Sequence, residues 1–280
     1  MFLFYINIIF NGSLREFAGV CGSLRGESLI FYYSVIRLYM LNILIFHFGD
    51  SARINLFIKE LETKKNLNLN IFNFFDKKDF IHYKNTQPYV DYDGVFLLGT
   101  GGKNFDSCID DKTLYKIIIK DPMPWRKGLE TYPNDNNFLE NMIYIINKNK
   151  NKPIFGLCYG YQLLNYYYGG TFRFLKFKNT GNQKTSVDSN NKLFRGVDKD
   201  FYANYNHYYY CENNSYGVKN IATSERLPNV AKQFSPIHFA HFHVIHSDET
   251  SMKIINNFLK IVKEEKNKGS FDKFFDLLFN

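Results

Sequence analysis

The chain has 280 residues, of which 45% are hydrophobic and 18% aromatic, and its formal net charge is +8. This length and apolar content suffice for one domain with a sizeable core, and they exclude a chain that is disordered throughout. The basic residues are scattered lysines, so the charge predicts no specific nucleic-acid partner. The four cysteines are far apart and form no Cys-x-x-Cys pair, which disfavours a zinc site or a disulfide framework and predicts a reducing, cytoplasmic environment.

The N-terminal region is interpreted as an extension. Met40 is followed at once by an apolar run that predicts a buried strand, so we expect the domain to begin there. Residues 1–39 are then either a true appendage or a translated leader upstream of the natural start. The opening segment, Met1 to Phe10, lacks a basic stretch and is too short to span a bilayer, which disfavours a signal peptide and predicts no membrane partner.

From Met40 onward, segments with strand-like and helical patterns alternate. Apolar runs predict strands over 43–48, 67–75, 94–98 and 153–155. Helical spacing is found in 51–62, 138–147 and 161–168, and again from Ser251. Short apolar runs among Tyr and Asn in 171–239 indicate a small antiparallel portion. The pattern predicts a three-layer α/β fold with a mainly parallel central sheet, helices on both faces and a site at the C-terminal ends of the strands.

The most informative segment is Gly156-Leu157-Cys158-Tyr159-Gly160, a Gly-x-Cys-x-Gly core between a predicted strand and a predicted helix. A nucleophile elbow needs small residues on either side, because the nucleophile lies in a strained turn where a Cβ would meet neighbouring backbone. The turn places the sulfur at a helix N-terminus, which favours the reactive thiolate. Cys158 is therefore the candidate nucleophile, and the strand–turn–helix context disfavours a merely structural cysteine.

Residues 156–164 resemble the signature of class I (triad) glutamine amidotransferases, which is close to Gly-Ile-Cys-x-Gly-x-Gln-Leu-Leu and differs here only at Leu157. The resemblance covers about Met40 to Val262. It implies a flavodoxin-like fold and hydrolysis of the glutamine side-chain amide through a γ-glutamyl thioester, with ammonia passed to a partner synthetase. We therefore expect an amidotransferase-like domain over 40–265 and a C-terminal tail or helix over 266–280, which could dock on a partner or pack on its own domain.

The resemblance also implies roles for individual residues. Cys158 would be the nucleophile and His243 the base that accepts its proton. The backbone N–H groups of Tyr159 and of the loop at Gly101 and Gly102 would hold the developing oxyanion. The residues that would line the substrate pocket are Gln162, Asn206, His207 and Tyr208.

One departure from the family pattern concerns the third member of the triad. The family motif His-Pro-Glu carries an acid that orients the imidazole, whereas Val244 and Ile245 follow His243 here. Asp248 or Glu249 could turn back to orient the His243 imidazole, or a backbone carbonyl could orient it. Cys158 and His243 could also act as a dyad without an acid. Two alternative functions therefore stay open, a γ-glutamyl peptide hydrolase on the same fold and a catalytically impaired binding protein.

The sequence predicts no metal and no cofactor. Four histidines lie close together, but strand geometry would place two on each face, which makes one tetrahedral set awkward. They are His238, His241, His243 and His246. There is no P-loop motif, so we do not expect the chain to use ATP itself.

Overall fold

The structure is a computed structural model, and its chain divides into two compact units, Met1–Leu41 and Asn42–Asn280. Apart from Leu41, the first residue of strand β1, the fold described below lies in the second unit. The residues that the structure describes are 40–48, 52–73, 76–86, 90–99, 138–211, 217–241 and 248–279.

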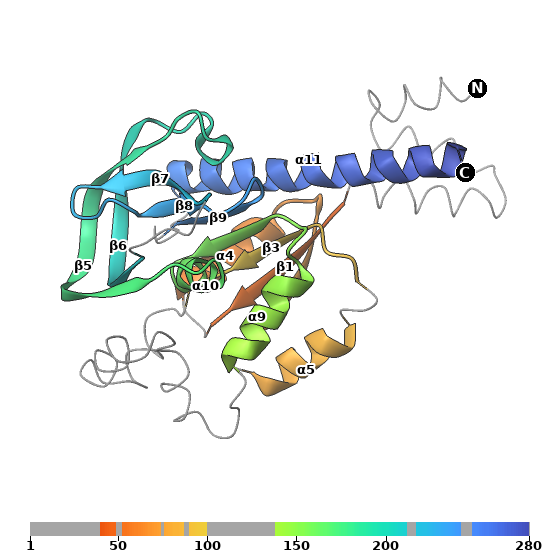
Figure 1. Cartoon of the computed structure of the whole chain (residues 1–280), viewed down its shortest axis with the longest axis horizontal. Helices are drawn as coiled ribbons and strands as arrows, with labels where there is room; N and C mark the ends of the chain where they lie inside the picture. Colours follow the sequence, from red (N-terminus) through yellow and green to blue (C-terminus); the bar gives the residue numbers. More distant parts are fainter. Residues whose placement is uncertain are drawn as a thin grey trace. The chain divides into compact units, whose positions relative to one another are not determined.

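The described strands form one nine-stranded sheet with the order β2-β1-β3-β4-β9-β8-β7-β5-β6 (Figure 1). Strand β1 pairs in parallel with β3, β3 with β4, and β4 with β9, whereas the pairings from β9 to β6 are antiparallel. The strand bounds are β1 Leu41–His47, β2 Leu67–Asn73, β3 Gly94–Leu97, β4 Ile154–Leu157, β5 Phe172–Val187, β6 Asp200–Cys211, β7 Lys219–Ser224, β8 Ala231–Gln233 and β9 His238–His241. The predicted parallel centre with an antiparallel portion is confirmed.

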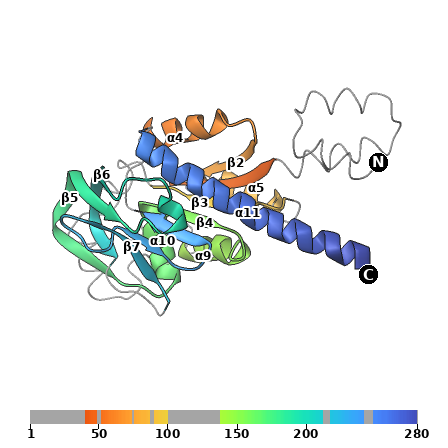
Figure 2. The ribbon, with the colours of Figure 1, turned by 90° about the horizontal axis from the view of Figure 1, so that it is seen from above.

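Helices cover both faces of the parallel part (Figure 2). Their bounds are α4 Ala52–Glu62, α5 Lys77–Thr86, α9 Phe138–Lys148, α10 Tyr159–Tyr167 and α11 Glu249–Phe279, and a short 3-10 helix, η2, spans Lys192–Phe194. Helices α4 and α11 lie on one face, while α5, α9 and α10 lie on the other. In the described part of the chain, no helix is both long and apolar enough to cross a membrane.

Aromatic side chains fill the space between the layers. On the face covered by α4 and α11, Phe96 of β3 packs against Phe57 at 5.4 Å and against Phe258 of α11 at 4.9 Å between ring centroids. On the other face, Phe46 of β1 packs against Tyr83 of α5 at 5.0 Å. Strands buried on both faces carry continuous apolar runs rather than alternating ones, which explains why the sequence pattern located β1, β3 and β4.

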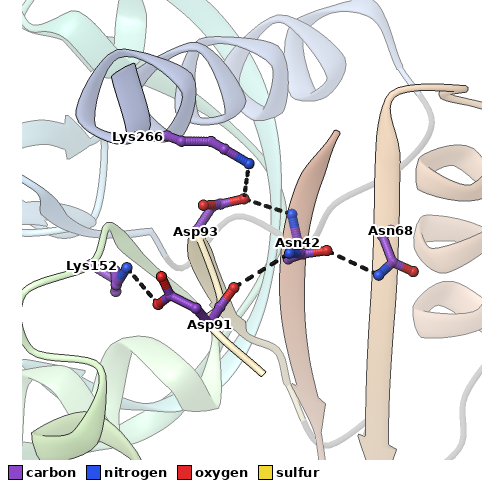
Figure 3. Close-up of polar contacts among 6 residues, drawn as sticks. All are labelled: Asn42, Asn68, Asp91, Asp93, Lys152 and Lys266. Carbon is purple, nitrogen blue, oxygen red and sulfur yellow. Dashed lines mark hydrogen bonds and ion pairs between the residues drawn. The ribbon is translucent and has the colours of Figure 1, made fainter. Parts of the chain in front are cut away.

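The closing helix α11 was predicted from Ser251, and it continues past residue 265 without a break. Asp248 caps its N-terminus, since the Ser251 N–H donates to one carboxylate oxygen at 2.8 Å and the Ser251 hydroxyl to the other at 2.9 Å. Further along, the Lys266 ammonium pairs with Asp93 at 2.8 Å, and the Asn42 N–H donates to the same Asp93 oxygen (Figure 3). These contacts join α11 to the edge of the sheet at which β1 and β3 begin.

Helix α5 was not predicted from the sequence. Its apolar residues are few, and Ile81 remains 46% exposed. One residue that anchors the helix is Tyr83, which is fully buried beside Phe46 and Phe72 and accepts a hydrogen bond from the Asn149 amide at 3.3 Å. Because these contacts join residues far apart in the sequence, local periodicity gives little sign of the helix.

Candidate functional site

Cys158 lies in the turn between β4 and α10 with backbone angles φ 55° and ψ −104°. Among the described residues it is the only one other than glycine with a positive φ. Such a conformation costs on the order of 1–3 kcal/mol and persists where surrounding structure fixes it. One fixing contact is the Cys158 N–H, which donates to the His241 carbonyl of β9 at 3.1 Å. The strained turn that the sequence predicts at this position is therefore present.

The glycines around Cys158 are required by close backbone contacts. A Cβ at Gly160 would lie 1.9 Å from the Leu97 carbonyl oxygen, and a Cβ at Gly156 would lie 2.5 Å from the Gly160 carbonyl oxygen. A third glycine, Gly99, lies just after β3. A Cβ there would lie 3.2 Å from the Cβ of Cys158 and 3.6 Å from its sulfur, so the end of β3 approaches the thiol closely.

The side chain of Cys158 is a reduced, partly exposed thiol at the N-cap of α10. The N–H groups of Tyr161 and Gln162 donate to the Cys158 carbonyl at 3.1 and 3.3 Å, which starts the helix directly at the cysteine. The positive end of the helix dipole therefore lies at the sulfur, where it favours negative charge. This arrangement suits a nucleophile that a reagent or substrate can reach.

Tyr159 and Gln162 both lie in the first turn of α10. The Tyr159 ring is buried and packs edge-on against Phe48 at 4.8 Å between ring centroids. This contact fixes the residue whose backbone N–H was predicted to face the oxyanion. The Gln162 side chain is buried, with only 5% of its surface exposed.

Three predicted substrate-binding residues lie next to one another in β6, and strand geometry separates two of them. Asn206 is exposed, whereas His207 is buried and has one ring nitrogen 3.1 Å from the Asn179 amide nitrogen. Successive residues of a strand point to opposite faces, so Asn206 and His207 cannot both face one pocket while β6 is regular. For Tyr208 the structure describes the backbone within β6.

The remaining predicted catalytic groups are only partly described. His243, Gly101 and Gly102 lie outside the described residues. The two candidate orienting acids lie at the start of α11, where Asp248 caps the helix and Glu249 pairs with Lys253 at 2.9 Å on the surface. Within the described ranges, no group of three or more His, Cys, Asp or Glu side chains could hold a metal ion.

Sequence reasoning missed a buried lysine near the elbow. Lys232 of β8 has no exposed surface, and its ammonium donates to the Asn165 side-chain oxygen of α10 at 2.9 Å. Burial lowers the Lys232 pKa to about 8. Burial also raises the pKa of the neighbouring Cys211 thiol, which keeps that thiol neutral. A single lysine in a short strand gives no sequence signal for burial, because lysines usually lie at the surface.

Comparison with known proteins identifies related sequences. Residues 131–262 match the family model of glutamine amidotransferase class-I. GMP synthase (glutamine-hydrolyzing) of Campylobacter jejuni strain RM1221 is 32% identical over 150 residues, which are 51% of this chain and 28% of that protein. The protein of the same name from Acetivibrio thermocellus is 31% identical over 112 residues, which are 38% of this chain and 22% of that protein. The chain thus spans about a quarter of the length of these curated relatives.

Two solved structures share the fold. One is described as a GMP synthase subunit from Thermoplasma acidophilum, with a TM-score of 0.59 and 19% identity over 82% of this chain and 98% of that chain. The other is a glutamine amidotransferase from Thermotoga maritima, with a TM-score of 0.52 and 17% identity over 82% of this chain and 85% of that chain. At these identities the likeness concerns the fold alone.

Proposed function

We propose that the chain is a class-I glutamine amidotransferase, which hydrolyses the side-chain amide of glutamine at Cys158 and releases ammonia for a partner synthetase; the match of residues 131–262 to that family model supports the proposal. The observation that carries the proposal is the strained turn at Cys158, which holds a reduced, partly exposed thiol at the start of α10. Such strain is maintained at catalytic nucleophiles, where it keeps the side chain out of the helix and open to substrate.

The proposed reaction has two halves. The Cys158 sulfur attacks the amide carbon of glutamine, its proton passes to His243, and the carbonyl oxygen becomes negatively charged. The N–H groups of Tyr159 and of the loop at Gly101 and Gly102 hold that oxygen. The carbon–nitrogen bond then breaks, His243 gives its proton to the departing ammonia, and a γ-glutamyl thioester remains.

In the second half, water attacks the thioester and loses its proton to His243. The carbon–sulfur bond breaks, His243 returns the proton to the sulfur, and glutamate leaves. No cofactor is needed for either half, since both are acyl transfers. Gln162 is proposed to help seat the glutamine because it follows the nucleophile within the first turn of α10.

A second candidate function is that of a catalytically impaired binding protein. The residue at the position of the orienting acid favours this candidate. Ile245 stands where the family carries the orienting acid, and the carboxylates of Asp248 and Glu249 already have partners within α11. Loss of the orienting acid lowers turnover by up to about 10⁴-fold in the chymotrypsin-type triad. The proposed glutaminase is therefore expected to be slow unless a partner completes its site.

The decisive experiment measures ammonia release from glutamine by the full chain. Cys158→Ala is expected to abolish release, while Cys211→Ala, which removes a buried thiol instead, is expected to retain it. Ammonia release by Cys158→Ala equal to that of the wild type would refute the enzyme proposal. A glutamine analogue with an electrophilic carbon then separates the two candidates, because an assembled glutamine site places the Cys158 sulfur in position to be labelled, even where turnover is slow.

The partner is proposed from the relatives. The Campylobacter relative carries the name of a complete synthase and is much longer than the matched segment. The Thermoplasma structure is described as one subunit of such a synthase, and this chain covers nearly all of it. We therefore propose that a synthetase is supplied by a separate chain, and purification of the tagged protein under native conditions tests this. Recovery of the protein without a nucleotide-activating enzyme, together with unchanged glutaminase activity when such enzymes are added, would refute it.

A further inference from the structure

Lys232 is linked to the nucleophile turn by cross-strand pairing through three neighbouring strands. Lys232 of β8 is paired with Ala240 of β9, and Ala240 is paired with Gly156 of β4. Directly paired residues point to the same face of a sheet, so the Lys232 side chain shares the face on which Gly156 contacts α10. Ala240 and Gly156 are both small, which leaves the space under α10 to the lysine side chain.

The lysine is joined to the elbow helix through Asn165. Its ammonium donates to the Asn165 side-chain oxygen at 2.9 Å, and both residues are buried. The amide nitrogen of Asn165 donates in turn to the Thr171 carbonyl at 3.1 Å, which fixes the orientation of the amide. Asn165 lies two turns beyond Cys158 in α10, so Lys232 restrains the helix that begins at the nucleophile.

We infer that Lys232 is a positioning residue for the nucleophile: its buried ammonium anchors α10 through Asn165 and favours the thiolate form of Cys158. The inference rests on the proposed role of Cys158. A positive charge favours a nearby thiolate, and a buried charge is screened less than one at the surface. Two strand spacings, about 10 Å, separate the backbone of Lys232 from that of Gly156, which precedes Cys158 by two residues, and we take this spacing as the scale of the charge–thiol separation.

The titratable groups described around Lys232 carry no negative charge near pH 7. Cys211 of β6 interacts electrostatically with both Lys232 and Cys158, and Tyr161 of α10 interacts with Cys211. Burial raises the pKa of both the Cys211 thiol and the Tyr161 phenol, so both groups are neutral near pH 7. His241 neighbours Ala240 along β9 and therefore points to the opposite face. The Lys232 pKa of about 8 leaves its ammonium mostly charged at pH 7.

The test is the pH dependence of Cys158 alkylation by iodoacetamide, followed by mass spectrometry of the peptide that contains Cys158. A positive charge about 10 Å from a thiol, at an effective dielectric constant of about 20, lowers the pH midpoint of alkylation by about one unit. Lys232→Met is therefore expected to raise the alkylation midpoint by about one unit and to slow labelling up to tenfold at pH 6.5. The control is Lys152→Met, which removes a lysine that pairs with Asp91 at the edge of the sheet where β3 and β4 begin. This variant should keep the wild-type alkylation profile.

Superimposable profiles for Lys232→Met and the wild type would overturn the inference. A reciprocal measurement needs no substitution. Carbamidomethylation of Cys158 in the full chain removes the thiolate, and the Lys232 titration followed by NMR should then move to lower pH. An unchanged Lys232 titration would also overturn the inference. Neither readout requires turnover, so a shifted profile without glutaminase activity would refute the proposed function and retain the role of Lys232.

Discussion

Acid pH is expected to destabilise the fold through His238, the first residue of β9. Its side chain is 1% exposed, and both ring nitrogens have partners. One nitrogen donates to the Lys152 carbonyl at 3.0 Å, which leaves the other to accept from the Tyr168 hydroxyl at 2.5 Å. The neutral imidazole therefore makes both hydrogen bonds. Burial lowers the His238 pKa from its ordinary value of 6.5 to about 4.

The sign of the effect follows from proton binding. Between pH 6.5 and pH 4, His238 in the unfolded chain binds a proton that the folded chain excludes, so the free energy of unfolding falls as the pH falls through this window. Above pH 6.5 both states are neutral, and below pH 4 both are protonated, so the contribution is flat outside the window. The pKa difference corresponds to a loss of about 3 kcal/mol between the two limits.

Urea unfolding, followed by circular dichroism at several pH values from 7.5 to 4, measures this loss. His238→Gln keeps a donor toward the Lys152 carbonyl but cannot be protonated, so its free energy of unfolding should fall by about 3 kcal/mol less than that of the wild type over the window. His82→Gln is the matched control because it removes an exposed imidazole from α5. Parallel curves for His238→Gln and the wild type would refute the reasoning.

Four substitutions test the packing of the domain by the same urea assay at pH 7.5. Phe258→Ala removes a fully buried ring between α11 and the sheet and should cost about 3–5 kcal/mol; a cost below about 1 kcal/mol would contradict the described core. Lys266→Met leaves the buried Asp93 carboxylate without its cation and should cost about 3 kcal/mol. Lys152→Met breaks a more exposed ion pair with Asp91 and should cost less than about 1 kcal/mol. Equal costs would contradict the difference in burial between the two ion pairs. Gly160→Ala places a Cβ 1.9 Å from the Leu97 carbonyl oxygen and should cost at least about 3 kcal/mol; a wild-type urea midpoint would show that the backbone can move aside.

The elbow could be predicted from the sequence because its cause is local. A residue forced to positive φ between a strand and a helix needs glycines at fixed spacing, and Gly156 and Gly160 provide them. The buried strands could be predicted for a similar reason, since each is a short continuous apolar run. The location of the site within α10 and at the end of β4 therefore followed from residues within ten positions of Cys158.

The features that escaped prediction depend on pairing between distant segments. Lys232 is buried because β8 pairs with β9 and β9 with β4, and no pattern near residue 232 shows those partners. The same holds for His207, whose partner Asn179 lies on β5. The roles of His243, Gly101 and Gly102, the domain limits at 40 and 265, and the cytoplasmic environment stay predictions.

The contacts at the start of α11 bear on how the base could be oriented without the usual acid. Strand β9 ends at His241 and α11 begins at Glu249, so any acid that turns back to His243 must do so from the first turn of this helix. Recruiting Asp248 would break its cap, which costs about 1 kcal/mol. Recruiting Glu249 would break a surface pair with Lys253 that contributes less than about 1 kcal/mol, and its side chain is 84% exposed. Glu249 is thus the less costly acid for the proposed triad, although ordering so exposed a side chain adds an entropy cost that a bound partner could offset.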